Sequence, residues 1–260
     1  MKLLLAIMSP WVFVSYVSAM EVYAFRNGCA FGDYETEAKT LISLGYTGIS
    51  QVKKGGEDLA ERIAIYERHG LKVLSIYLNV EDTPIKLETV KPFAGKKALI
   101  ELTVRKRTPQ TIDAVTKTVE MASKMGIKVA LYPHHGFAVA TMPQAMAIIE
   151  EVQHPNLGVM FNLCHFLRGE NVEHLETTLE KAGDRLFAIS TNGADIDGKN
   201  WAQLIQPLDQ GSFPQERLFK SLKALGFSGP VGIQCYGVKG DKQKNLQRSM
   251  EAWKKVIADY

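Results

Sequence analysis

The sequence predicts an eight-stranded βα barrel, because helices and apolar strands alternate along it, because a glycine follows several of the helices, and because its length suits that fold. A barrel of this kind takes about 250 residues, and the chain has 260. A helix is followed by a glycine and then by an apolar strand at Gly45, Gly70, Gly126, Gly183 and Gly226. Glycine just past a helix end takes the left-handed conformation that turns the chain back. Such alternation implies parallel βαβ units.

Eight apolar runs are the predicted strands. They are Val22–Arg26, Thr47–Gln51, Val73–Asn79, Leu99–Val104, Val129–His134, Gly158–Asn162, Leu186–Asn192 and Val231–Tyr236. Thr108-Pro109 predicts a helix N-cap, and Ser212 and Gln215 have the spacing of a capping box. The residues between Asp195 and Ser212 are expected to form a loop over the barrel mouth. A doubly wound open sheet is the alternative, but no GxGxxG motif follows the first strand.

Residues 1–19 are predicted to be a secretory signal peptide. Lys2 precedes the uncharged, mostly apolar run Leu3–Val17, and small residues end it at Ala19. The run is shorter than the roughly 20 apolar residues of a membrane span, and Pro10 interrupts it. We therefore expect cleavage after Ala19, a single barrel domain over residues 20–260, and an exported protein, periplasmic or secreted, with no stable membrane association after cleavage.

Charge and cysteine content exclude some classes of partner. The formal charge is only +3, and no basic run with interleaved aromatic residues is present, so we expect no nucleic-acid partner. The three cysteines, Cys29, Cys164 and Cys235, have no CxxC or metal-type spacing. An exported protein could pair two of them, and three unpaired thiols are the alternative.

Side-chain alternation predicts which residues face the barrel axis. In Leu99–Val104 the apolar residues Ile100, Leu102 and Val104 pack under helices, so Glu101 and Thr103 point inward. The same rule points polar side chains inward at the strand ends: Arg26, Gln51, Tyr77, Asn79, Tyr132, His134, Asn162, Ser190, Asn192, Gln234 and Tyr236. Lower inward positions are small or apolar: Ala24, Ala130, Met160, Ala188 and Gly232. Burying many polar groups is costly unless they meet water, a ligand or one another, so the mouth is the predicted binding site.

Four motifs at the ends of the later strands carry a resemblance to a known family. They are LYPHHG at 131–136, GVMFNLCHFL at 158–167, LFAISTNGAD at 186–195 and GPVGIQCYG at 229–237. With them, residues 21–260 resemble the sugar phosphate isomerase/epimerase family of xylose isomerase-like TIM barrels. The resemblance implies a sugar-like ligand at the mouth. It also implies a divalent metal held by Glu, Asp, His and Glu from the fifth to eighth strands, with a second histidine that helps to hold the substrate.

The metal ligands that the resemblance implies are largely replaced in this chain. The fifth-strand Glu falls near Tyr132–His134, Asn162 stands at the Asp position, Ser190 at the histidine position and Gln234 at the last Glu, while His165 keeps the second histidine. A hard cation needs anionic oxygens, which neutral amides do not supply. The sequence leaves open a weakly held zinc or manganese ion on His134, Asn162 and Gln234.

The predicted function is that of a sugar isomerase or epimerase that moves a proton next to a carbonyl of a small carbohydrate. Glu101, His134 and His165 are the predicted catalytic acids or bases. The predicted substrate-binding residues are Arg26, Tyr132, His135, Asn162, Asn192, Gln234 and Tyr236. A non-catalytic sugar-binding barrel that has lost the metal site is the alternative. An endonuclease of the same fold would need metal-binding carboxylates and a basic groove, and the sequence offers neither.

Overall fold

Eight parallel strands close into a barrel in sequence order, with β1 paired to β8, in the computed structural model. The structure describes residues 20–29, 31–52 and 57–258. The strands are β1 Val22–Phe25, β2 Gly48–Val52, β3 Lys72–Val80, β4 Leu99–Val104, β5 Lys128–Leu131, β6 Leu157–Asn162, β7 Leu186–Thr191 and β8 Val231–Ile233. The predicted single-domain barrel is thereby confirmed, while the predicted signal peptide lies outside the described residues.

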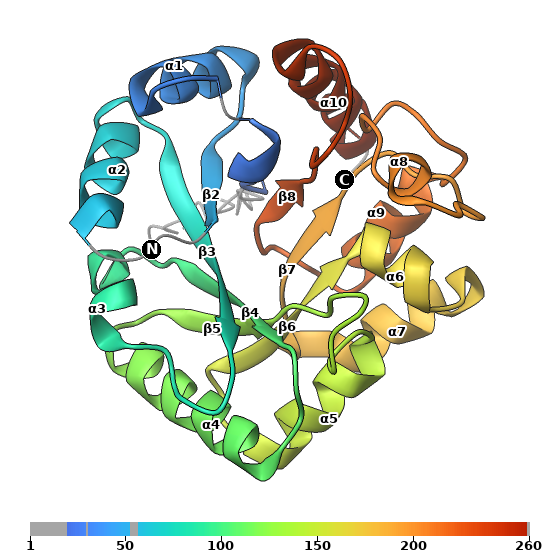
Figure 1. The fold of residues 1–260 in the computed structure, drawn as a ribbon. Coiled ribbons are helices and arrows are strands. Elements are labelled where there is room, and N and C mark those ends of the chain that lie inside the picture. The colour runs from blue at the N-terminus through green and yellow to red at the C-terminus, as the bar shows by residue number, and fades with distance from the viewer. Residues whose placement is uncertain (1–19, 30, 53–56, 259–260) are drawn as a thin grey trace, which may run out of the picture.

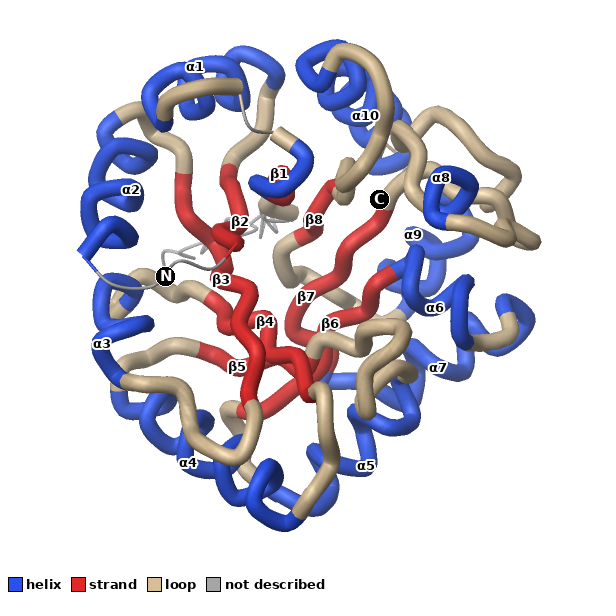
Figure 2. The backbone as a smooth tube through the Cα atoms, in the orientation of Figure 1, coloured by secondary structure: helices blue, strands red, loops and turns tan. Residues whose placement is uncertain are grey.

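Helices surround the barrel, as Figures 1 and 2 show from one end. The α-helices are α1 Tyr34–Leu44, α2 Glu57–Arg68, α3 Leu87–Val90, α4 Pro109–Lys124, α5 Met142–Val152, α6 Leu163–Gly169, α7 Leu175–Ala182, α8 Trp201–Leu204, α9 Gln215–Ala224 and α10 Lys242–Ile257. Short 3₁₀ turns are η1 Arg26–Gly28, η2 Lys91–Phe93, η3 Val172–His174 and η4 Gly183–Arg185. No helix in the part of the chain that the structure describes is long and apolar enough to span a membrane.

The local signals in the sequence set most of the helix boundaries. The five glycines predicted to end helices all have a positive φ, between +46° and +97°. Thr108 caps α4, and its hydroxyl accepts a hydrogen bond from the Thr111 N–H at 3.1 Å. The capping box predicted at Ser212 is wrong, because the Ser212 hydroxyl accepts from Ile196 N–H and holds the β7–α9 loop instead.

Inside the barrel, large aromatic side chains pack in the space that small residues leave. The interior cluster consists of Tyr23, Phe25, Leu74, Leu99, Ala130, Tyr132, Met160 and Ala188. A Cβ added at Gly232 would lie 2.5 Å from a Phe25 ring carbon and 2.7 Å from a Tyr23 ring carbon, so the absence of a side chain on β8 makes room for the two β1 rings. The prediction that Ala24 faces the interior is wrong, since Ala24 packs in the outer core under the helices.

The inward direction predicted for two polar residues on the first two strands is also wrong. Ser50 points inward, so the side chain of the next residue, Gln51, points outward, where its Oε1 accepts from Arg62 of α2 at 3.2 Å. Arg26 belongs to the η1 turn and pairs with Glu37 of α1, because the chain leaves β1 before that residue. On these two strands, a polar residue at the strand end was not enough to predict which side chains face the barrel axis.

Two strands, β5 and β8, end three residues earlier than predicted, and both ends lie at the mouth. β5 stops at Leu131 because Pro133 has no N–H for the strand ladder, although Tyr132 N–H still donates to Leu102 at 2.8 Å. β8 stops at Ile233, and Gln234 N–H still donates to Thr191 at 2.9 Å. The residues just beyond these strands are therefore held to the barrel while their side chains are free to line its mouth.

Candidate functional site

A cavity of about 550 Å³ opens at the carboxyl ends of the strands. In βα barrels this end carries the active site. The cavity is lined by Phe25, Asn27, Tyr77, Tyr132, His134, His135, Cys164, His165, Trp201, Ala202, Ile205, Gln234, Tyr236 and Gly237. None of these lining residues is Asp, Glu, Lys or Arg, so the described wall is neutral and strongly aromatic. Its volume suits a small molecule of the size of one sugar ring.

Two imidazoles stand side by side in this wall, with ring centroids 4.2 Å apart. His165 Nδ1 accepts a hydrogen bond from the His135 backbone N–H at 3.2 Å, so the proton of the neutral His165 ring is on Nε2. His134 Nδ1 lies 2.9 Å from the His135 carbonyl oxygen, which can only accept, so that nitrogen carries the proton of the His134 ring. The backbone of one residue thus assigns opposite tautomers to the two rings.

Burial keeps both rings neutral. Burial, helped by the neighbouring His134 and His135, lowers the pKa of His165 to about 3. Burial also lowers the pKa of His134 below its ordinary value of 6.5. At neutral pH the pocket therefore presents one imidazole nitrogen that accepts a proton, His134 Nε2, and one that donates a hydrogen bond, His165 Nε2–H.

Aromatic side chains complete the rim of the cavity. Trp201 of α8 packs edge-on against His165, with ring centroids 5.2 Å apart, and Tyr77 packs against Tyr132 at 5.4 Å. Trp201 is 40% exposed and Tyr236 is 60% exposed, so both can meet a ligand that enters from solvent. Trp201 was missed as a site residue, although it lies in the β7–α9 loop that was expected over the mouth.

Tyr132, Asn162 and Gln234 form the polar floor of the cavity. Asn162 Nδ2 donates to the Tyr132 hydroxyl, and the Gln234 amide lies near enough to lower the pKa of that phenol. Burial raises the pKa of the Tyr132 phenol well above its ordinary value, with the Gln234 amide working in the opposite direction. The floor therefore holds a protonated phenol that accepts a hydrogen bond from the Asn162 amide.

Glu101 lies inside the barrel as predicted, but the residues that line the cavity do not include it. Its Oε1 accepts from Tyr23 Oη at 3.1 Å and from Ser75 Oγ at 2.5 Å, while its Oε2 has no hydrogen-bond partner among the described residues. Burial raises the pKa of Glu101 to about 7, against the lowering effect of the Ser75 and Tyr23 bonds. The structure thus separates this carboxyl group from the two histidines with which it was predicted to act.

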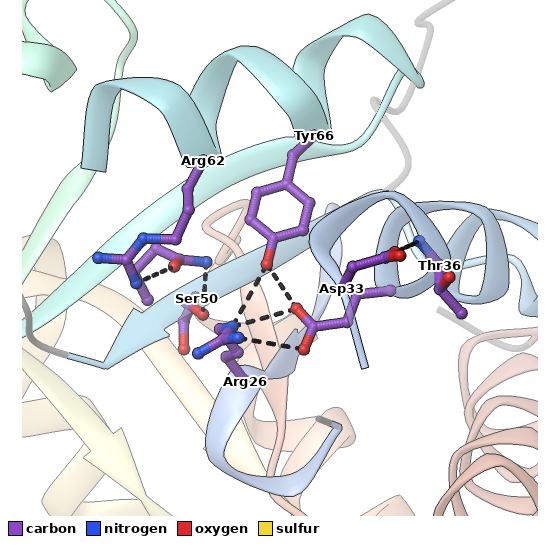
Figure 3. A network of polar contacts seen from close by, with 8 residues as sticks. Arg26, Asp33, Thr36, Ser50, Arg62 and Tyr66 are labelled. Carbon is purple, nitrogen blue, oxygen red and sulfur yellow. Dashed lines mark hydrogen bonds and ion pairs between the residues drawn. The ribbon is translucent and has the colours of Figure 1, made fainter. Parts of the chain in front are cut away.

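Arg26 belongs to a polar network beside the mouth and does not line the cavity (Figure 3). Its Nε and NH2 groups donate to both oxygens of the buried Glu37 carboxylate at 3.1 and 3.2 Å. The Tyr66 hydroxyl donates to the same carboxylate at 2.5 Å. The guanidinium also lies over the Tyr34 ring, at 5.0 Å from its centroid. These contacts anchor the η1 turn, from which Asn27 reaches the cavity.

Asn192 also lies outside the cavity lining. Its Nδ2 donates at 2.7 Å to the carbonyl oxygens of both Gly193 and Leu204, so it ties the β7–α9 loop to the strand end. Of the predicted site residues, Tyr132, His134, His135, His165, Gln234 and Tyr236 line the cavity. Asn162 supports it from the floor, and Glu101, Arg26 and Asn192 stand apart from it.

The floor does not fit the divalent metal that the family resemblance implies. The described residues contain no group of three or more His, Cys, Asp or Glu side chains that could hold a metal ion. The amide oxygens that could serve as ligands already accept hydrogen bonds, Asn162 Oδ1 from the Cys164 thiol at 3.1 Å and Gln234 Oε1 from Tyr236 N–H at 3.0 Å. The Asn162 NH₂ group donates to the phenol, and a cation is repelled by such a donor.

Comparison with known proteins gives the chain a family. Residues 103–256 match the model of the xylose isomerase-like TIM barrel family. An inosose isomerase of Bacillus subtilis (strain 168) is 24% identical over 158 residues, which are 58% of this chain and 54% of that protein. An inosose isomerase of Bacillus velezensis is 22% identical over 185 residues, 68% of this chain and 64% of that protein. The chain therefore spans just over half of the first relative and less than two thirds of the second.

Solved structures share the fold. A structure of L-ribulose 3-epimerase superimposes with a TM-score of 0.75 at 13% identity and covers 93% of this chain and 95% of its own. An IOLI protein with a binding zinc atom gives a TM-score of 0.71 at 19% identity, over 93% of this chain and 99% of its own. The family model covers more than half of the 260 residues. The chain belongs to the xylose isomerase-like TIM barrel family.

Proposed function

We propose that the mouth cavity binds an uncharged sugar or sugar derivative and moves a proton between the carbon atoms next to its carbonyl group. The observation that carries this proposal is the pair of opposite tautomers in the cavity wall, an acceptor nitrogen on His134 beside a donor N–H on His165. Moving a carbonyl group along a carbon chain needs a base for a C–H proton and hydrogen-bond donors for the oxygens.

His134 is the proposed base. Its Nε2 is free to accept because Nδ1 is engaged with the His135 carbonyl oxygen at 2.9 Å. Its lowered pKa keeps it unprotonated at neutral pH. His165, held neutral by burial, donates from Nε2 to a substrate oxygen, a role that a neutral imidazole can fill beside a carbonyl.

The arrangement favours isomerisation over epimerisation. Isomerisation takes a proton from one carbon and returns it to the next on the same face of the substrate, so a single base suffices. Inversion at one carbon needs a second acid–base group on the opposite face. His134 and His165 stand side by side, and the carboxyl group of Glu101 does not reach the cavity.

The neutral wall favours a free sugar over a phosphorylated one. Among the described lining residues there is no lysine or arginine to hold a phosphate. Exposed aromatic rings at Trp201 and Tyr236 suit the C–H faces of a sugar ring. Two of the relatives are named inosose isomerase. An inosose, which is a cyclic polyhydroxy ketone without charge, is therefore the first compound to test.

The test is hydrogen exchange in D₂O. The protein is incubated with an inosose or with D-allulose, and proton NMR follows the loss of the C–H signals next to the carbonyl and the appearance of an isomer. We expect exchange above the protein-free rate with the inosose, and its loss in His134→Asn, which keeps a hydrogen-bonding group at that position. Failure of both compounds to bind would refute the neutral-sugar assignment.

A non-catalytic sugar-binding barrel is the second candidate, and the replaced ligand positions at Asn162 and Gln234 favour it. The same experiment separates the two functions, because a binding protein would take up the inosose in calorimetry without accelerating C–H exchange.

We also propose that the protein is exported. Cleavage after Ala19 would leave a mature chain that begins at Met20. Mass spectrometry of protein from the native host is expected to show that N-terminus, and an intact chain in the cytoplasm would refute export.

A further inference from the structure

The hydroxyl group of Tyr132 lies beside a side-chain amide in the floor of the mouth cavity. Asn162 Nδ2 donates to it, and the Gln234 amide, just beyond β8, lowers the pKa of the phenol. Tyr132 is 3% exposed and lines the cavity. Asn162 and Gln234 stand at two positions where the family resemblance implies carboxylate ligands of a divalent metal. The Tyr132 phenol oxygen thus contacts Asn162, which stands at one of these two positions.

A hydrogen bond to its oxygen atom fixes the orientation of each amide. The Cys164 thiol donates to Asn162 Oδ1 at 3.1 Å, which turns Asn162 Nδ2 toward the phenol. The Tyr236 backbone N–H donates to Gln234 Oε1 at 3.0 Å, so the NH₂ group is the part of that amide left for the phenol. Asn162 therefore offers a proton to the floor, where a metal ion would need lone pairs.

We propose that the Tyr132 phenol is a catalytic acid of this site and acts on the substrate carbonyl oxygen in place of a metal ion. The Asn162 amide proton occupies a lone pair of Oη, and the phenol proton remains free, since no hydrogen bond from Tyr132 Oη to a protein acceptor is formed within the described residues. This donor stabilises the negative charge that Oη gains when it gives up its proton, and the Gln234 amide acts in the same direction. This inference rests on the proposed function, because it requires a carbonyl substrate in the cavity.

The proton transfers balance over one turnover. His134 Nε2 takes the proton from the carbon next to the carbonyl while Tyr132 gives its proton to the carbonyl oxygen, which yields an enediol, an imidazolium and a phenolate. The phenolate then takes the proton from the neighbouring hydroxyl oxygen, and the imidazolium returns its proton to the former carbonyl carbon. Both side chains end as they began, and the carbonyl group has moved by one carbon.

The test compares Tyr132→Phe with the natural protein, with an inosose as the probe. Calorimetry measures binding, and proton NMR in D₂O measures C–H exchange, both before and after treatment with EDTA. We expect Tyr132→Phe to bind the inosose within about threefold of the natural protein and to lose at least about 100-fold in exchange rate, the range for a general acid. EDTA is expected to change neither measurement.

Tyr46→Phe is the matched control. It also removes a buried phenol hydroxyl, one that donates to the Leu246 carbonyl oxygen at 3.0 Å and lies outside the cavity lining. We expect its exchange rate to equal that of the natural protein, so a loss confined to Tyr132→Phe is not a general effect of deleting a buried hydroxyl.

Each other outcome overturns the inference in a distinct way. If the natural protein exchanges and Tyr132→Phe keeps the rate, the acid is another group and the proposed function stands. If EDTA abolishes exchange and zinc restores it, a metal ion does this work. If the natural protein binds the inosose without exchange, the proposed isomerase function fails, and the role of Tyr132 fails with it.

A second measurement does not depend on the folding of the Phe variant. With 3-fluorotyrosine at position 132, the ¹⁹F resonance reports contacts of that ring in an otherwise natural protein. We expect the inosose to move this resonance and zinc to leave it unchanged. A resonance that responds to zinc and not to the inosose would overturn the inference.

Discussion

Replacing the buried carboxyl group of Glu101 with an amide should change how the stability of the protein depends on pH. Both hydroxyl donors, Tyr23 and Ser75, meet Oε1, while Oε2 has no hydrogen-bond partner in the described part of the chain. The charged form is therefore poorly compensated in the interior. Burial accordingly raises the pKa of Glu101 from its ordinary value of 4.5 to about 7.

The sign and size of the effect follow from proton linkage. Between pH 4.5 and 7 the folded protein holds a proton on Glu101 that the unfolded chain has released, so this residue makes stability fall as the pH rises. The difference between the two pKa values corresponds to about 3 kcal/mol, at about 1.4 kcal/mol per pH unit. Glu101→Gln cannot ionise. Its free energy of unfolding relative to the natural protein should therefore increase by about 3 kcal/mol between pH 4.5 and pH 8.

Urea unfolding at several pH values measures this difference. All other ionisable groups are common to both proteins and cancel when the two curves are subtracted. Glu176→Gln is a control of opposite sign, because the hydrogen bond from Arg217 lowers the pKa of Glu176, and its loss destabilises the protein at neutral pH and not in acid. A pH-independent difference between Glu101→Gln and the natural protein would refute the reasoning and show that the interior accommodates the charge.

Three further predictions concern the mouth and the core. The exchange activity should persist as the pH falls below 6.5 and be lost only in more acidic solution, because the lowered pKa of His134 keeps the base free of its proton. A pH–rate profile in which the rate already falls above pH 6.5 would contradict this. Gly232→Ala should cost about 1–3 kcal/mol in urea unfolding through overpacking, whereas Gly169→Ala, whose Cβ would meet nothing closer than 3.9 Å, should be tolerated. Phe161→Ala should cost about 3–5 kcal/mol, since that ring is fully buried under the helices.

The fold could be predicted because its signals are local. Each glycine after a helix, such as Gly45 or Gly126, reports a backbone conformation that does not depend on the rest of the chain. Apolar alternation in Leu99–Val104 gave the correct inward direction for Glu101, whose neighbours Tyr23 and Ser75 come from other strands of the barrel. Runs of this kind need only their own pattern to specify a strand and its buried face.

The predictions that failed concern contacts between residues that are far apart in the sequence. On β1 the large rings of Tyr23 and Phe25 point inward because Gly232, more than 200 residues later, leaves space for them. Trp201 reaches the cavity because the β7–α9 loop folds over the mouth, where Asn192 holds it. The partners of an amide such as Asn162 are likewise set by tertiary structure, so sequence could place it at the mouth without showing that it faces a phenol.

The neutral residues of the cavity floor, Tyr132, Asn162 and Gln234, are best explained together and not one position at a time. A carboxylate at position 162 or 234 without a cation would place a charge in a buried site, where ionisation is costly. An amide there removes that cost, but it turns N–H protons toward the centre and needs an acceptor. For Asn162 the Tyr132 oxygen supplies that acceptor. The pairing of amide and phenol satisfies these groups without a metal ion, and it leaves the phenol proton available for the role proposed above.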